Sequence, residues 1–291
     1  MCCLLIPCCV AETEESGENE MKIPVETVET NDFSMDYFRF GKGKNVFVIL
    51  PGLSVESVMK YADAVAQEYS LLTDDYTVYM FDRRKEVPET YSVSDMARDT
   101  AAVFRALGLR QVSLFGASQG GMIAMTIAME YPELVGRLIL GSTSACVDQK
   151  HFRTIENWIH LAEAGRTEDL YLAFGEAVYP PDVFEQSKDW LSASAKSVTP
   201  EDLRKFVILA ESVRKFDVTD RLQAIACPVL VIGSEDDRVL GAEASRQIAE
   251  KLKDRPDCGL FMYNGYGHAA YDLAPDYRER ILRFLVSGIT D

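Results

Sequence analysis

Residues 112–130 read VSLFGASQGGMIAMTIAME, in which a short apolar run and a longer one enclose a serine with glycine neighbours. The first run has the length of a buried strand, and the second is apolar nearly all round, as in a buried helix. Gly116 and Gly120 flank Ser118 because side chains at these positions would collide with the strained backbone of a sharp strand-to-helix turn. The spacing predicts that the turn lifts the Ser118 hydroxyl above the carboxyl edge of a sheet, where open α/β sheets bind ligands.

On both sides of this segment, short apolar runs alternate with segments of helical periodicity. The predicted strands are 33–40, 46–50, 77–81, 112–115, 137–140, 229–232 and 259–263. The predicted helices are 55–69, 92–108, 120–130, 242–252 and 275–286. Ser92 is placed to cap the second of these helices and Gly108 to end it. The alternation predicts an α/β fold with a parallel sheet that is covered by helices on both faces.

The alternation stops between residues 142 and 216, where the spacing of apolar residues is typical of helices. Large apolar residues recur there at Trp158, Leu161, Leu170, Phe174, Trp190, Phe206 and Leu209. We therefore predict a helical cap over 142–216, inserted into a core made of 31–141 and 217–291.

The first thirty residues carry four of the seven cysteines and then an acidic run, ETEESGENE. No basic residue precedes Lys22, and Pro7 interrupts the apolar run, which argues against a signal peptide. S-acylation or a four-thiolate metal site stays open for the paired cysteines, although nothing else in the sequence supports either. We predict a disordered tail over 1–30, reduced thiols and a cytoplasmic protein, and we expect deletion of residues 1–20 to change neither activity nor solubility.

The composition limits the possible partners. The 291 residues include 30 Lys and Arg against 46 Asp and Glu, a formal charge of −16. This balance argues against a nucleic-acid partner and makes polyanionic substrates unfavourable. No apolar run reaches the roughly 18 residues of a membrane span, and no residue spacing suggests a metal or cofactor site. The oligomeric state is open, although apolar residues on a lid could support a homodimer.

A serine hydroxyl needs a base before it can act as a nucleophile, and the chain has three histidines. His151 and His160 lie in the predicted helical insertion, where a surface or packing role is expected. His268 lies in the glycine-rich segment NGYGHAA, after the last predicted strand and before the closing helix. A loop at that end of a neighbouring strand can reach Ser118, so we predict that His268 is the base. The alternative is a loop histidine that only caps the next helix.

A third side chain must hold the imidazole tautomer and stabilise its cation. The candidates follow the strand VLVI in the segment GSEDDRV, residues 233–239. We choose Asp236, with Asp237 as the runner-up. Asp82 and Asp148 are less favoured, because acidic residues at loop ends are common in an acidic chain.

The chain order Ser118, Asp236, His268 is that of the α/β-hydrolase fold. From Phe33 to Val286 the sequence resembles that superfamily, in its helical-cap branch of esterases, peptidases and C–C hydrolases. The resemblance rests on PG after the first long buried strand, FDRR after the next, GASQGG, CPVLVIGSEDDRV and GHAAYDLAPDYRERILRFL. In the family an acid follows the glycine of the penultimate strand loop by three positions, which also selects Asp236.

The resemblance implies a mostly parallel central sheet flanked by helices, and an oxyanion hole made by the amides of Leu53 and Gln119. The family usually has His-Gly in the oxyanion loop, whereas this chain has Pro51-Gly52. Because the expected donor is a backbone amide, replacing the histidine by Pro51 does not remove it. The replacement can change the shape of the loop.

These observations predict a serine hydrolase that cleaves a small or medium uncharged carboxylic ester through a Ser118 acyl-enzyme. A peptidase, lactonase, thioesterase or C–C hydrolase would use the same residues. A ligand-binding protein that kept the fold without turnover is a further alternative. A dinucleotide loop is rejected, because that fingerprint needs glycine where Ser118 stands.

Overall fold

The computed structural model describes residues 22–288 of the chain. The N-terminal paired cysteines and the proposed deletion of residues 1–20 lie outside this range, so the expectations for them stay predictions.

The described strands form one sheet of eight, in the order β1-β2-β4-β3-β5-β6-β7-β8. Their bounds are β1 Val25–Glu29, β2 Ser34–Phe40, β3 Asn45–Leu50, β4 Tyr76–Arg84, β5 Val112–Ala117, β6 Val135–Gly141, β7 Val229–Ser234 and β8 Cys258–Tyr263. β1 pairs antiparallel with β2, and β2 antiparallel with β4, while the remaining neighbours are parallel. The prediction of a mostly parallel sheet is confirmed.

Strand β1 corrects the predicted tail, which extended to residue 30. The segment VETVE alternates as a strand should, with the Val28 side chain buried. Glu26 accepts hydrogen bonds from the Tyr37 hydroxyl and from Arg39 Nε on β2, both at 3.0 Å. The strand was not predicted because the acidic composition of the N-terminal segment indicated a solvated tail. As an edge strand, β1 pairs with only one neighbour.

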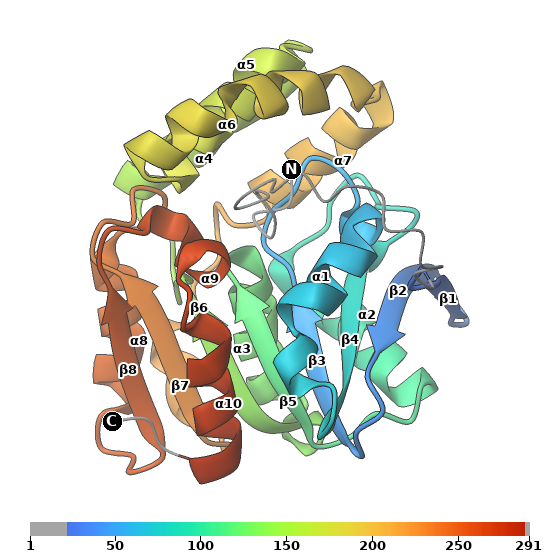
Figure 1. The fold of residues 1–291 in the computed structure, drawn as a ribbon, viewed down its shortest axis with the longest axis vertical. Coiled ribbons are helices and arrows are strands. Elements are labelled where there is room, and N and C mark those ends of the chain that lie inside the picture. The colour runs from blue at the N-terminus through green and yellow to red at the C-terminus, as the bar shows by residue number, and fades with distance from the viewer. Residues whose placement is uncertain (1–21, 289–291) are drawn as a thin grey trace, which may run out of the picture.

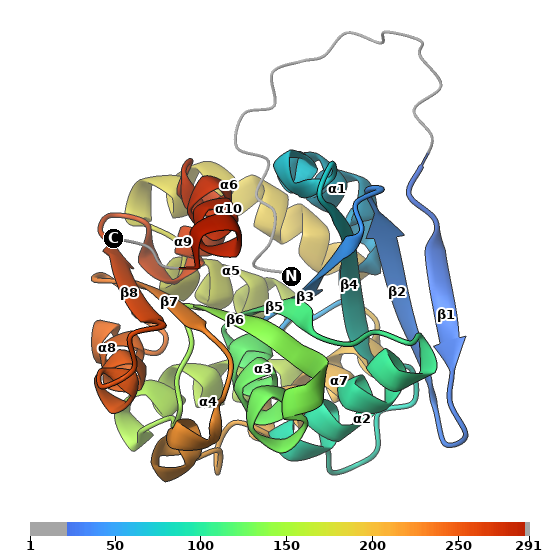
Figure 2. The ribbon, with the colours of Figure 1, turned by 90° about the horizontal axis from the view of Figure 1, so that it is seen from below.

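Helices cover both faces of the sheet (Figures 1 and 2). The helices are α1 Ala62–Glu68, α2 Val93–Ala106, α3 Gln119–Glu130, α4 Gln149–Glu163, α5 Thr167–Val178, α6 Pro181–Ser194, α7 Pro200–Glu211, α8 Ala242–Leu252, α9 Ala270–Leu273 and α10 Tyr277–Ser287. Helices α1 and α10 lie on one face of the sheet, and α2, α3 and α8 lie on the other (Figure 2). Ser92 caps α2 as predicted, in a reciprocal capping box with Asp95.

The core lies where sheet and helices meet. Every residue of β5 and β7 is buried, as are most residues of α3, so the chain around Ser118 is held from all sides. A rigid surrounding of this kind is what a strained turn requires, because the packing must outweigh the backbone cost.

Helices α4 to α7 form a separate layer over the carboxyl ends of the parallel strands (Figure 1). We call α4–α7 the helical layer. It leaves the sheet after β6 and returns before β7, which is where the sequence predicted an insertion. The layer therefore lies directly above the edge at which Ser118 emerges.

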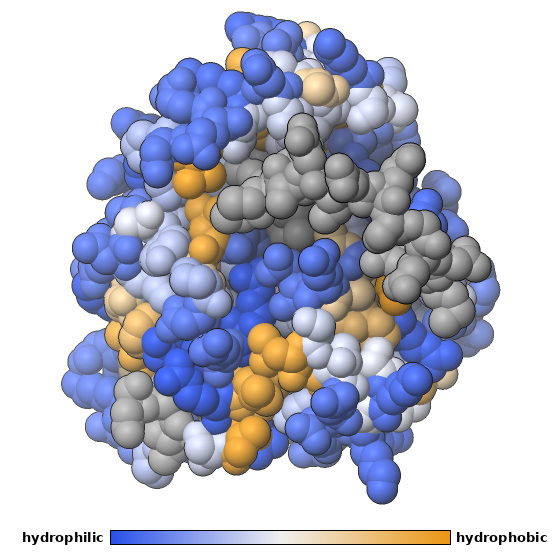
Figure 3. Space-filling model, viewed as in Figure 1, coloured by the Kyte–Doolittle hydropathy of each residue, from blue (hydrophilic) through white to orange (hydrophobic). Residues whose placement is uncertain are grey.

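On the face shown in Figure 3, most of the coloured surface is hydrophilic and the apolar residues gather in separate small groups. Of the large apolar residues that the structure describes, Val25, Leu71, Leu260 and Val286 are exposed. Between residues 22 and 288, no helix has the length and apolar character needed to cross a bilayer.

Candidate active site

Ser118 forms the whole connection between β5 and α3. Its backbone has φ 52° and ψ −121°, a conformation that non-glycine residues rarely adopt. A Cβ atom on Gly116 would lie 2.3 Å from the Gly120 carbonyl oxygen, and one on Gly120 would lie 2.1 Å from the Leu50 carbonyl oxygen. Gly116 therefore needs to be glycine for the reason that the sequence suggested, whereas at Gly120 a side chain would collide with the end of β3 and not with the turn itself.

The structure brings His268 to Ser118 across 150 positions of sequence. His268 lies in the short helical turn Gly267–Ala269 that follows β8, and only 1% of it is exposed. Its Nε2 atom lies 3.0 Å from Ser118 Oγ, within hydrogen-bond distance. This is the arrangement in which an imidazole can accept the proton of an attacking hydroxyl.

The carboxylate against His268 belongs to Asp237, so the choice of Asp236 as the contacting acid is wrong. Asp237 Oδ2 lies 2.8 Å from His268 Nδ1. The Asp237 side chain is 3% exposed and also accepts the amides of Val239 and Leu240, at 2.8 and 3.0 Å. Burial alone would raise the pKa of Asp237, but the His268 ring and these amides hold it below its ordinary value. Asp237 is thus held as an anion beside the ring.

Asp236 points to a different part of the same site. Its carboxylate accepts hydrogen bonds from the backbone amides of Gly265 and Gly267, each at 3.0 Å, and from the Ser234 hydroxyl at 2.8 Å. Burial opposes its charge, but these donors lower the pKa of Asp236. Two neighbouring aspartates therefore hold one histidine, Asp237 through the ring and Asp236 through the backbone of its loop.

The other candidates from the sequence have partners elsewhere. His151 Nδ1 lies 2.9 Å from Asp148, which caps α4, and His160 is exposed near the end of the same helix. Asp82 accepts hydrogen bonds from the Ser57 hydroxyl and from the Arg83 amide.

Leu53 and Gln119, the expected oxyanion donors, both lie next to Ser118. Leu53 follows β3, and Gln119 is the first residue of α3. The loop of Leu53 passes so close to the serine that a Cβ atom on Gly52 would lie 3.1 Å from Ser118 Cβ. A Pro51-Gly52 sequence is therefore compatible with an oxyanion loop in this position.

A small enclosed cavity of about 20 Å³ adjoins Ser118 and His268. Its lining is otherwise largely apolar and comes from the core and the helical layer: Leu53, Gln119, Met122, Ile155, Trp158, Phe174, Val178, Val213, Val239 and Leu240. The Trp158 and Phe174 rings pack with centroids 4.4 Å apart. A volume of this size holds about one water molecule, so the layer almost closes the site.

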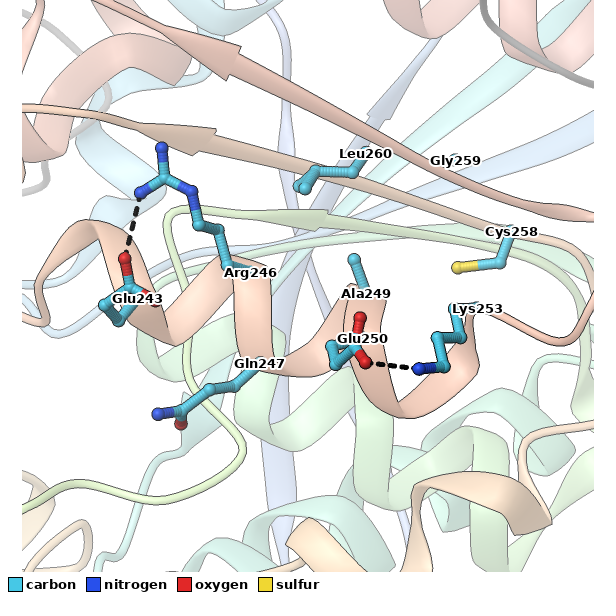
Figure 4. Close-up of a pocket in the computed structure, with 9 residues that line it drawn as sticks. All are labelled: Glu243, Arg246, Gln247, Ala249, Glu250, Lys253, Cys258, Gly259 and Leu260. Atoms are coloured by element: carbon cyan, nitrogen blue, oxygen red, sulfur yellow. Dashed lines mark hydrogen bonds and ion pairs between the residues drawn. The ribbon is translucent and has the colours of Figure 1, made fainter.

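A larger hollow of about 620 Å³ lies on the outside of the molecule between α8 and β8 (Figure 4). Its charged side chains pair with one another, Arg246 with Glu243 and Lys253 with Glu250. It contains none of the three residues Ser118, Asp237 and His268. Among residues 22–288, no group of three or more His, Cys, Asp or Glu side chains could hold a metal ion.

Comparisons with known proteins agree with this architecture. A family model described as "alpha/beta hydrolase fold" matches residues 45–275. "Putative carbamate hydrolase RutD" of Rhizobium rhizogenes is 28% identical over 229 residues, 76% of this chain and 86% of that protein.

Solved structures give the same result at the level of the fold. MGS-M2, an alpha/beta hydrolase enzyme from a Medee basin deep-sea metagenome library, has a TM-score of 0.79 and 21% identity, covering 91% of this chain and 98% of its own. The enol-lactonase from Burkholderia xenovorans has a TM-score of 0.76 and 17% identity, covering 89% and 99%. At such identities the likeness shows the fold alone.

Proposed function

The chain belongs to the alpha/beta hydrolase fold family, and on this premise we propose that it is a serine hydrolase that cleaves small carboxylic esters through an acyl-enzyme. The observation that carries the proposal is the continuous contact from Ser118 Oγ to His268 Nε2 and from His268 Nδ1 to Asp237 Oδ2, at 3.0 and 2.8 Å. Each group in this series has a chemical task that its surroundings support.

In the first half-reaction, His268 Nε2 takes the proton of Ser118 as Oγ forms a bond to the ester carbonyl carbon. The amides of Leu53 and Gln119 bind the negative oxygen that develops there, and the dipole of α3 adds to this stabilisation. When the carbonyl re-forms, the C–O bond to the alcohol breaks, and the alcohol leaves with the proton from Nε2. The anion of Asp237 stabilises the imidazolium during the interval.

In the second half-reaction, His268 takes a proton from water, and the hydroxide oxygen attacks the acyl carbon on Ser118. The tetrahedral species collapses to the carboxylic acid, and Nε2 returns its proton to Oγ. The cycle needs no metal or cofactor, because a base, an anion and two amide donors supply all of the chemistry.

The apolar lining of the cavity supports a small, uncharged acyl group, with the helical layer acting as a cap that shifts to admit it. The described residues that line the cavity include no Lys, Arg, Asp or Glu, so nothing there would balance a charged substrate. The name of the RutD relative raises carbamate hydrolysis as a second candidate. A carbamate N–H would meet mainly aliphatic and aromatic side chains, which favours the ester.

The test combines active-site labelling with a substrate panel. We expect a fluorophosphonate probe to label wild-type protein but not Ser118→Ala, and the wild type to hydrolyse p-nitrophenyl acetate faster than the octanoate. The panel also contains thioesters, lactones, aminoacyl amides, C–C substrates and carbamates. Faster turnover of any of these classes would identify that class, and not the ester, as the substrate. Folded protein that takes up no label would instead indicate a ligand-binding protein without turnover.

A further inference from the structure

Arg83 lies at the end of β4, in the FDRR segment, and is buried with 8% exposure. One of its nitrogens, Nη2, donates to the Pro51 carbonyl oxygen at 2.9 Å and to Gln119 Oε1 at 3.1 Å. A buried guanidinium forms strong, directional hydrogen bonds with such acceptors. Arg83 therefore joins the loop after β3 to the residue that follows the nucleophile.

The Gln119 side chain extends this connection to the helical layer. Its Nε2 atom donates to the Leu209 carbonyl oxygen at 2.6 Å and to the Ser212 hydroxyl at 3.1 Å, at the end of α7. A guanidinium can only donate, so Gln119 must present its oxygen to Arg83 and its nitrogen to α7. The contact with Arg83 thereby fixes the orientation of the Gln119 amide group.

Both joined segments carry an expected oxyanion donor. Leu53 lies two residues beyond Pro51, and the second donor is the backbone amide of Gln119 itself. Donors of this kind stabilise a transition state only when they are already in place, and small displacements reduce the rate strongly.

We propose that Arg83 is a positioning residue that sets the spacing of the two oxyanion amides, and that the Gln119 side chain couples this spacing to the seating of α7. The inference rests on the proposed function for its kinetic consequences. Its structural part, that Arg83 immobilises the loop after β3, is independent of turnover.

The first test compares Arg83→Met with Arg84→Met, which removes the same charge one position away. Arg84 contacts Asp99 and the Asp32 carbonyl oxygen, each at 3.4 Å, and neither belongs to the oxyanion loops. We expect Arg83→Met to lower kcat for p-nitrophenyl acetate about tenfold to a hundredfold with KM changed less than about threefold. Arg84→Met should keep wild-type kcat. Equal kcat in the two variants would overturn the proposal.

Arg83→Lys separates position from charge. It keeps the positive charge but replaces a planar group by a single ammonium, so we expect a kcat between those of wild type and Arg83→Met. A kcat equal to that of wild type would show that charge alone matters and would contradict a positioning role. Gln119→Leu should lower kcat as Arg83→Met does, and the double variant should lower it little further, because both changes break one connection.

Amide hydrogen exchange tests the same point without turnover. Peptides that cover residues 49–57 should exchange faster in Arg83→Met than in wild type, and at the wild-type rate in Arg84→Met. If wild-type protein failed to hydrolyse any substrate, the proposed function would fail while this measurement still tested the inference. Unchanged exchange in Arg83→Met would refute it.

Discussion

Asp236 and Asp237 are adjacent, yet their carboxylates act on different parts of the His268 segment. Asp237 meets the ring, where it can stabilise the charge that forms when Nε2 takes a proton. Asp236 accepts the amides of Gly265 and Gly267 and so holds the loop that carries the ring. The first task depends on the negative charge itself, whereas the second depends mainly on hydrogen-bond acceptors.

We therefore expect Asp237→Asn to lower kcat about a thousandfold to ten-thousandfold, since the amide cannot stabilise the imidazolium and can impose the wrong tautomer. Asp236→Asn should retain most of kcat but lose about 1 to 2 kcal/mol of unfolding free energy, because one amide donor loses its acceptor. Steady-state kinetics and urea unfolding of both variants measure the two effects. The reverse pattern would restore Asp236 as the acid.

Among the site residues, the sequence pointed to Ser118 and His268, which lie in contact, but it selected Asp236 where the structure places Asp237. Gly116 and Gly120 mark Ser118 as the residue of a sharp turn for a steric reason, and only three histidines compete for the base. No comparable signal separates Asp236 from Asp237. The backbone torsions of the loop after β7 determine which of the two carboxylates faces His268. These torsions cannot be predicted from composition or from residue spacing.

Among the elements, the segment between β3 and α1 is held to the helical layer by Glu56. Its carboxylate accepts the Tyr171 hydroxyl from α5 at 2.7 Å and the Ser197 hydroxyl at 3.0 Å, and it pairs with Lys60 at 2.6 Å. Burial opposes the charge, but Lys60 and the two hydroxyls hold the pKa of Glu56 below its ordinary value. Layer and core are thus joined at a second place besides Gln119.

A lowered pKa means that Glu56 stabilises the fold above the pKa of the unfolded chain and loses this contribution as pH falls through the folded value. We expect Glu56→Gln to be less stable than wild type by about 1 to 2 kcal/mol at pH 7. The difference should begin to shrink below about pH 4.3, where the side chain becomes neutral in the unfolded chain, and should shrink further as pH falls through the lower folded value. Urea unfolding of both proteins from pH 7 to pH 3.5 measures it, and a constant difference would contradict this role of the Glu56 charge.

At the scale of elements, long apolar runs and caps were predictable, since β5, β7, α2 and α8 lie within a few residues of their expected places. Helix α1 is shorter than predicted, because Val58–Tyr61 forms a tighter 3₁₀ turn before it. The short helix α9 was not predicted, since four residues carry no periodic signal.

For the molecule as a whole, we expect the fit between the helical layer and the core to limit the size of the substrate. Trp158 and Phe174 of the helical layer close the cavity, so an acyl group larger than the one water molecule that it can hold must displace part of the layer. Selection by size in an apolar pocket amounts to about 1 to 3 kcal/mol for each methylene group.

Trp158→Leu should therefore shift the preferred acyl chain from acetate towards butanoate or hexanoate, with a change of about tenfold or more in the ratio of kcat/KM values. Trp190→Leu on α6 is the matched control, because Trp190 is partly buried against the apolar cluster of the molecule without lining the cavity. The p-nitrophenyl ester series measures both variants. A shift in the control as large as that in Trp158→Leu would show that general loosening, not cavity size, changes the preference.

The proposed roles of Ser118, His268 and Asp237 are tested most directly by the rate at which a fluorophosphonate modifies Ser118. Peptide-mapping mass spectrometry follows this rate in wild type, Asp236→Asn and Asp237→Asn. We predict that the label maps to Ser118, that Asp236→Asn reacts at close to the wild-type rate, and that Asp237→Asn reacts slower by orders of magnitude. A label on another residue, or full reactivity in Asp237→Asn, would contradict the proposed roles of Ser118, His268 and Asp237.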